Sequence, residues 1–180
     1  MKNLTKKEVN FSQFIGFTFV SVLGTILHFL FKLTGENKLF ALFSSVNEST
    51  WEHMKILFFP LLLYALLQSF FLGKSYENFW CVKCKGILYG VSAVPVIFYT
   101  LQGVFGGTPD WVNISIFFLA SAISFSWESK NFQRGSEPCR WKIGAILLLC
   151  AVAVAFFLLT FFPFQIPLFQ DPIYGYFGIK

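Results

Sequence analysis

The chain has 180 residues, of which 56% are hydrophobic and only 13% are charged. A soluble domain has about a quarter charged residues, and its helices keep a polar face that whole segments of this chain lack. The 26 phenylalanines would form a large apolar surface in water. These features exclude an ordinary soluble fold and predict an integral membrane protein. The net charge of +5 does not indicate nucleic-acid binding, because the basic residues form short clusters between apolar runs.

Apolar runs that could cross a hydrocarbon core about 30 Å thick follow one another along the chain. The expected spans are residues 11–33, 54–72, 86–104, 112–126 and 143–162. The first run is too long for the core of a signal peptide, so we expect it to be retained as a helix. Residues 163–180 form a tail that is too interrupted by proline and glycine for a sixth helix. The sequence therefore predicts an all-α bundle of about five transmembrane helices in a single domain, residues 1–180.

Lysine and arginine are distributed unevenly between the two sides of these spans. If the N-terminus lies inside, ten of the fourteen basic residues face the cytoplasm. The positive-inside rule then places the N-terminus in the cytoplasm and the C-terminus outside. We expect a multi-pass protein of the plasma membrane, with the lipid bilayer as its principal partner.

The densest polar stretch beside an apolar span is Ser44–Lys55, on the outer side. Helix capping and the helix dipole explain Asn47 and Glu48 at the start of the second span. They do not explain Glu52 and His53, which follow one turn later. Glu48 and Glu52 are four residues apart and are expected to share a helix face. Two carboxylates and an imidazole could bind a divalent metal ion or act in acid–base catalysis, so Glu52 and His53 are the candidate catalytic residues.

His28 lies near the outer end of the otherwise apolar first span. Ionisable residues within a membrane are costly and usually face the bundle interior. A hydrogen bond between helices would account for His28 as well as a ligand site would. If it faces inward, Glu52 or His53 is its nearest expected partner, because the connecting loop makes the first two spans neighbours. Asp171 joins them only if the tail folds over the bundle and does not lie on the outer membrane surface. The candidate metal ligands are His28, Glu48, Glu52, His53 and Asp171.

The cysteines are too few and too unevenly placed for the disulfide framework of a secreted protein. Cys81 and Cys84 have the CxxC spacing, and Cys139 lies on the same side. A structural zinc site normally needs four ligands, and a thioredoxin-type redox site needs a βαβ unit that the sequence does not predict. Neither role is favoured for these thiols.

Two segments carry a resemblance to a known family. They are Leu42–Lys55 and Ile166–Ile179, and together with the spans between them the resemblance covers essentially the whole chain. The chain resembles an uncharacterised family of small bacterial multi-pass membrane proteins with a domain of unknown function. The resemblance implies a bacterial plasma membrane and no established activity. The family pattern has proline where Ser45 stands and histidine where Gln165 stands, and the second departure weakens a metal site that would use the tail.

Three hypotheses about function remain open. The polar cluster could be an extracytoplasmic metal site in a membrane hydrolase-like protein. The chain could instead be a small transporter or small-molecule-binding module, with kinks at Pro60 and Pro95 that open a cavity. An odd number of spans argues against an internal inverted repeat, so such a transporter would need to form a homo-oligomer. A membrane scaffold would need no pocket. The sequence has no HExxH or GxSxG motif and no phosphate-binding glycine loop that would identify an enzyme.

Overall fold

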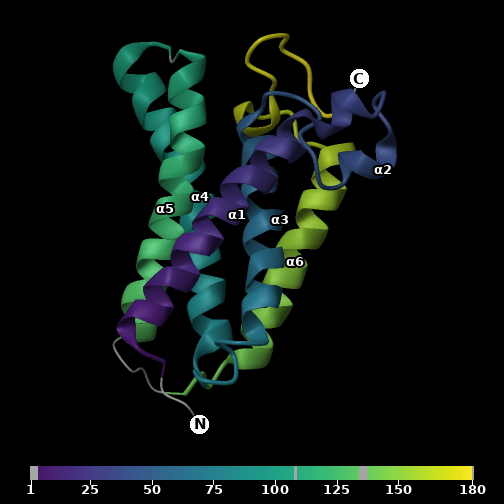
Figure 1. Ribbon diagram of the computed structural model, residues 1–180. Helices are drawn as coiled ribbons and strands as arrows, with labels where there is room; N and C mark the ends of the chain where they lie inside the picture. The colour runs from purple at the N-terminus through teal and green to yellow at the C-terminus, as the bar shows by residue number, and fades with distance from the viewer. Residues whose placement is uncertain (1–3, 108, 134–137, 180) are drawn as a thin grey trace.

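The computed structural model describes residues 4–107, 109–133 and 138–179 and is built from helices that run between two ends of the molecule (Figure 1). The long helices are α1 (Lys6–Leu33), α3 (Thr50–Ser69), α4 (Phe79–Phe105), α5 (Asp110–Gln133) and α6 (Lys142–Phe161). Two short segments, α2 (Lys38–Ala41) and the 3-10 helix η1 (Pro167–Phe169), lie near the end that carries the C-terminus. Within the described ranges there is no β-strand, only an isolated bridge between Gln170 and Phe177. The predicted all-α class is confirmed.

Four helices are long and apolar enough to cross a membrane. They are α1, α4, α6 and the stretch Trp111–Gln133 of α5. The remaining long helix, α3, is not among them, and its first two turns carry Glu52, His53 and Lys55. The prediction of a helical chain with several membrane-compatible helices is therefore confirmed. The number of five spans and the orientation stay predictions. Lys2, Arg134 and Lys180, which enter the charge count, lie outside the described residues.

Two helices extend well beyond the spans that the sequence predicted. The span predicted to begin at residue 86 corresponds to α4, which begins at Phe79. The span predicted to end at residue 126 corresponds to α5, which ends at Gln133. The added turns contain Lys83 and Glu128, whose Nζ and Oε2 atoms lie 2.6 Å apart with both side chains almost fully buried. Each charge alone marks the end of an apolar run. Paired inside the bundle, they satisfy one another and allow the helices to continue.

Close helix packing depends on glycines at the contacts. α1 crosses in front of α3, with α5 on its other side (Figure 1). A Cβ atom at Gly24 of α1 would lie 2.3 Å from the ring of Phe117 of α5, so only glycine permits this approach. Between α4 and α5, a Cβ atom at Gly90 would lie 2.9 Å from Ser124 Cβ. The helices α3 and α4 continue through Pro60 and Pro95.

The tail after α6 packs against the bundle. Phe169 is buried, and its ring lies 4.8 Å from that of Trp51 between ring centroids. Asn47 Nδ2 donates a hydrogen bond of 2.9 Å to the carbonyl oxygen of Gly178. The tail therefore folds over the loop before α3, and apart from the 3-10 helix η1 it forms no helix among its described residues. Asn47 is used in this contact, and the cap of α3 is Ser49, whose hydroxyl accepts from Glu52 N at 3.4 Å.

At the opposite end of the molecule, Cys81 of α4 forms a disulfide with Cys139 in the segment before α6, with Cα atoms 5.8 Å apart. Cys84 is buried and unbonded, and Cys150 is exposed on α6. The spacing of Cys81 and Cys84 thus places one cysteine toward the α5–α6 connection and the other toward the core. The chain forms a single cross-link here among its described residues, not a framework.

Candidate metal centre at the tail end of the bundle

Three residues from separate parts of the chain converge at this end. His28 lies on α1, one and a half turns before the helix ends, Glu48 lies in the loop before α3, and His53 lies in the first turn of α3. The loop is held against α1 by a backbone hydrogen bond of 3.2 Å from Ser45 N to Leu27 O. This contact brings the start of α3 beside the end of α1.

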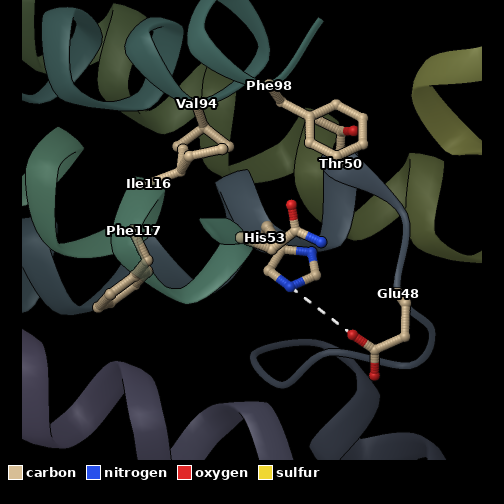
Figure 2. Close-up of a pocket in the computed structure, with 8 residues that line it drawn as sticks. Glu48, Thr50, His53, Val94, Phe98, Ile116 and Phe117 are labelled. Atoms are coloured by element: carbon tan, nitrogen blue, oxygen red, sulfur yellow. Dashed lines mark ion pairs between the residues drawn. The ribbon is translucent and has the colours of Figure 1, made fainter. Parts of the chain in front are cut away.

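The ligand-type atoms of this cluster face one another. Glu48 Oε2 lies 3.9 Å from His28 Nε2 and 3.7 Å from His53 Nε2, and the three ligand atoms all lie within 4.8 Å of one another. Figure 2 shows the His53 ring and the Glu48 carboxylate pointing toward each other. In a tetrahedral zinc site with bonds of about 2.0–2.1 Å, ligand atoms lie roughly 3.3 Å apart. Closing the cluster around an ion therefore requires movements of roughly 0.5–1.5 Å.

A hydrogen bond outside the cluster orients one of the imidazoles. His53 Nδ1 lies 2.9 Å from the carbonyl oxygen of Ser49, so the nitrogen that donates to this carbonyl is Nδ1. The tautomer with Nδ1–H leaves the lone pair of Nε2 directed at Glu48, which is the arrangement found in metal-binding histidines. Lys32 Nζ lies 3.9 Å from Glu48 Oε1 and adds a positive charge at the edge of the cluster.

Asp171 contacts the backbone of Glu48 but contributes no ligand atom to the cluster. Its Oδ2 atom accepts from Glu48 N at 3.1 Å. Its Oδ1 atom accepts from the backbone N–H groups of Ile173 and Tyr174, at 2.8 and 2.9 Å. Both carboxylate oxygens are thus bound to backbone amides, and the side chain is 1% exposed. The structure brings Asp171 near Glu48, as the folded-over tail requires, but not among the ligand atoms.

Glu52 also lies outside the cluster. Glu48 precedes the cap of α3, so it has no helical position and does not share a face with Glu52, contrary to the expectation from their spacing. Glu52 Oε2 lies 2.6 Å from Lys55 Nζ and accepts from Val46 N at 3.0 Å. Its Oε1 atom accepts from Thr160 Oγ1 of α6 at 3.1 Å. With a side chain 2% exposed, Glu52 joins the loop, α3 and α6.

A cleft of about 580 Å³ opens beside the cluster. It runs between α1 and the α4–α5 pair and includes tail residues on its wall. Its lining residues are Gly24, Thr25, His28, Phe29, Glu48, His53, Ile56, Phe98, Gln102, Gly107, Asn113, Ile114, Phe117, Phe118, Pro172 and Ile173. A smaller hollow of about 30 Å³ lies on the α4–α5 side of His53, against Phe98 and Phe117 (Figure 2). Beside the cluster, the lining has the polar residues Thr25, Gln102 and Asn113, and most of its other residues are apolar, a mixture typical of small-molecule sites.

Sequence reasoning did not anticipate two polar features. Lys32 is not among the predicted site residues, and its Nζ atom lies 3.9 Å from Glu48 Oε1. The predicted spans left Lys83 and Glu128 in two different connecting segments, whereas in the structure they form a buried pair. The sequence did contain a signal for this pair. Each of the two charges lies only a few residues from an apolar run, and the helix formed by that run could continue through the charge if the charge were paired.

Comparison with known proteins identifies a family and no relative of known activity. A family of unknown function, DUF6512, matches residues 1–179. The chain belongs to this family. This confirms the resemblance that the two polar segments carry, while a bacterial source stays a prediction. No curated protein and no solved structure matches the chain. Function in this family member must therefore be argued from the site itself.

Proposed function

We propose that this DUF6512 protein is a metal-dependent membrane protein of hydrolase-like type, with Zn²⁺ held by His28, Glu48 and His53. The observation that carries the proposal is the convergence of three ligand atoms, within 4.8 Å of one another, from a helix, a loop and a second helix. Two histidines and one glutamate are a ligand set of catalytic zinc sites, which keep a fourth position for water or substrate. A zinc-bound water has a pKa near 7 and supplies a nucleophile for hydrolysis.

The half-buried position of the cluster suits such a role. The side chains of His28, Glu48 and His53 are 26%, 27% and 22% exposed, so an ion would be sheltered and still reachable from the cleft. A structural zinc site would be closed by a fourth protein ligand. Among the described residues, the cluster offers three.

Elemental analysis of the purified protein tests the metal site. We expect about one zinc per chain in the unmodified protein, and little in the His28→Ala and His53→Ala variants, because a site with two remaining ligands binds weakly. Glu36→Gln is the matched control, since Glu36 is an exposed carboxylate in the nearby α1–α2 connection. A metal-free unmodified protein, or His variants that keep the metal, would contradict the proposal.

We further propose five spans with the N-terminus in the cytoplasm, the site outside, and the plasma membrane as the location. The charge bias of the sequence supports this orientation. The Cys81–Cys139 bridge would then lie on the cytoplasmic side, where thiols are usually reduced, and it supports the opposite orientation. Labelling intact cells with a membrane-impermeant maleimide decides between them. Glu36→Cys should react and Lys74→Cys should not if the site is outside.

Transport is the second candidate function, and a polar cluster deep in the bundle favours it. Lys83 Nζ lies over the ring of Tyr64, whose hydroxyl donates to Ser12 O, and Gln68 donates to the Oγ atom of the same serine. Polar groups inside a membrane bundle often mark an ion path. A transporter of this size would act as a homo-oligomer. Zinc uptake into proteoliposomes, abolished by both His53→Ala and Glu128→Gln, would favour transport over hydrolysis. A membrane scaffold would not need the cleft.

A further inference from the structure

The cleft beside the metal cluster has a polar end and an apolar body. Its polar end is formed by the cluster itself. Its body lies between Thr25 and Phe29 of α1 and Ile114, Phe117 and Phe118 of α5. Its volume of about 580 Å³ falls within the range of roughly 300–1,000 Å³ that is usual for small-molecule sites.

The shape of the cleft is set by one helix contact. α1 and α5 meet at Gly24 and Phe117, where no side chain larger than glycine fits. On the cluster side of this contact the space between the two helices widens, and the side chains along it remain exposed: Phe29 is 52%, Ile114 60% and Phe118 36% exposed. Pro172 and Ile173 of the tail line the same cleft at the cluster end. An apolar rim along two membrane-compatible helices would face hydrocarbon and not water.

The charge of the metal-loaded site selects the polar part of a ligand. A divalent ion with one glutamate and two neutral histidines carries a net charge of +1. Lys32, 3.9 Å from Glu48 Oε1, adds another positive charge at the same place. An anionic group could therefore take the fourth position on the metal and also face the lysine ammonium.

Resting on the proposed metal site, we infer that the cleft binds an anionic amphiphile: a lipid whose phosphate or carboxylate head reaches the metal and whose chain lies between α1 and α5. The chain enters sideways through the rim of Phe29, Ile114 and Phe118. The same cleft thereby recognises both parts of the molecule, the head by charge and the chain by burial of apolar surface. The site acts on, or carries, a lipid of the surrounding bilayer.

Cobalt substitution in non-ionic detergent tests this inference, because the visible absorption of protein-bound Co²⁺ changes when its open position is filled. The probes are dodecyl phosphate, dodecanoate, methyl phosphate and dodecanol. We expect dodecyl phosphate to change the spectrum at a concentration at least about tenfold below that of methyl phosphate, since the chain adds binding energy. Dodecanoate acts similarly if any anionic head suffices, whereas dodecanol leaves the spectrum unchanged.

Two matched variants distinguish binding of the probe chain in the cleft from its partition into the detergent micelle. Thr25→Trp fills the cleft one turn below His28 and should abolish the preference for the long-chain probe while leaving the cobalt spectrum intact. Ile26→Trp, at a half-exposed position of the same helix turn outside the cleft, should keep the preference. Equal action of dodecyl and methyl phosphate, or a preference that survives Thr25→Trp, overturns the inference. Failure to take up cobalt at all overturns the metal site instead, so the two failures are distinct.

Discussion

Glu48 and Glu128 lie toward opposite ends of the helical bundle, and each has basic side chains beside it. Glu128 is 0% exposed, and its Oε2 atom lies 2.6 Å from Lys83 Nζ, with the rings of Tyr64 and Phe125 against the ammonium group. Glu48 is 27% exposed, and its basic neighbours lie 3.7 to 3.9 Å away. The first arrangement is a direct hydrogen-bonded ion pair. The second is too long for hydrogen bonds.

This difference separates a carboxylate that is already used from one that is available. The closed pair joins α4 to α5 through Glu128 Oε2 and Lys83 Nζ, so it can hold these two helices together, although Glu128 Oε1 has no hydrogen-bond partner among the described residues. The open cluster makes no direct hydrogen bonds between its three groups, so movements of roughly 0.5–1.5 Å would let them close around an ion at bond lengths near 2 Å. The distance between the carboxylate oxygen and its basic neighbours, more than the residue type, therefore distinguishes the structural carboxylate from the proposed metal ligand in this molecule.

The largest effect is expected from breaking the closed pair. Lys83→Met leaves Glu128 buried without a counter-charge and should lower the free energy of unfolding by about 3–5 kcal/mol. The double variant Lys83→Met with Glu128→Leu should recover most of this loss, because an apolar pair of similar volume suits the bundle interior. Thermal unfolding in detergent measures both. Equal losses in the single and double variants would show that the pair does not hold the helices.

A somewhat smaller loss, about 3 kcal/mol, is expected from Glu52→Gln, which leaves Lys55 buried and unpaired. The single carbonyl oxygen of glutamine can still accept from Val46 N or from Thr160 Oγ1, but not from both at their present positions, so only part of the network survives. The zinc content should not change, because Glu52 faces Lys55 and not the cluster. Loss of zinc in a variant that remains folded would return Glu52 to the ligand set and weaken the contrast between closed and open carboxylates.

The smallest of the three effects is expected from Asp171→Ala. It removes three charge-assisted hydrogen bonds but leaves no buried charge unpaired, so the expected loss is about 1.5–3 kcal/mol. Because one of these bonds positions the backbone of Glu48, zinc affinity should fall by about 10–100-fold, as for other residues that orient a ligand. Competition with a chromophoric chelator measures the affinity. An unchanged affinity would show that Glu48 needs no support from the tail.

The fold was largely predictable from the sequence where apolar runs end in neutral or turn-forming residues. The run 143–162 matches α6 to within one residue at each end, and Gly35 follows the end of α1. The beginning of α4 and the end of α5 were not predictable in this way. Lys83 and Glu128 each ended an apolar run when taken alone, and nothing local to either residue shows that the other lies beside it.

The candidate site was predictable only in part. His28 and His53 were expected to approach one another because the connecting loop makes their helices neighbours, and their ring centroids lie 5.5 Å apart. The separation of Glu52 from Glu48 depended on where α3 begins, and a cap at Ser49 instead of Asn47 moved Glu48 out of the helix. The role of Asp171 depended on a turn of the tail, which residue spacing does not reveal.

The tail has a consequence for the order in which the protein matures. Residues 28, 48 and 53 are synthesised early, whereas the groups that hold the loop in place, Asp171 and Gly178, are synthesised more than a hundred residues later. During synthesis these contacts to the loop can therefore form only after α6 and the tail have been made. An ion that entered earlier would meet a loosely held Glu48. A chain that ends before residue 171 would therefore contain His28, Glu48 and His53, the three proposed ligands, but would lack the tail contacts that hold the loop of Glu48 in place.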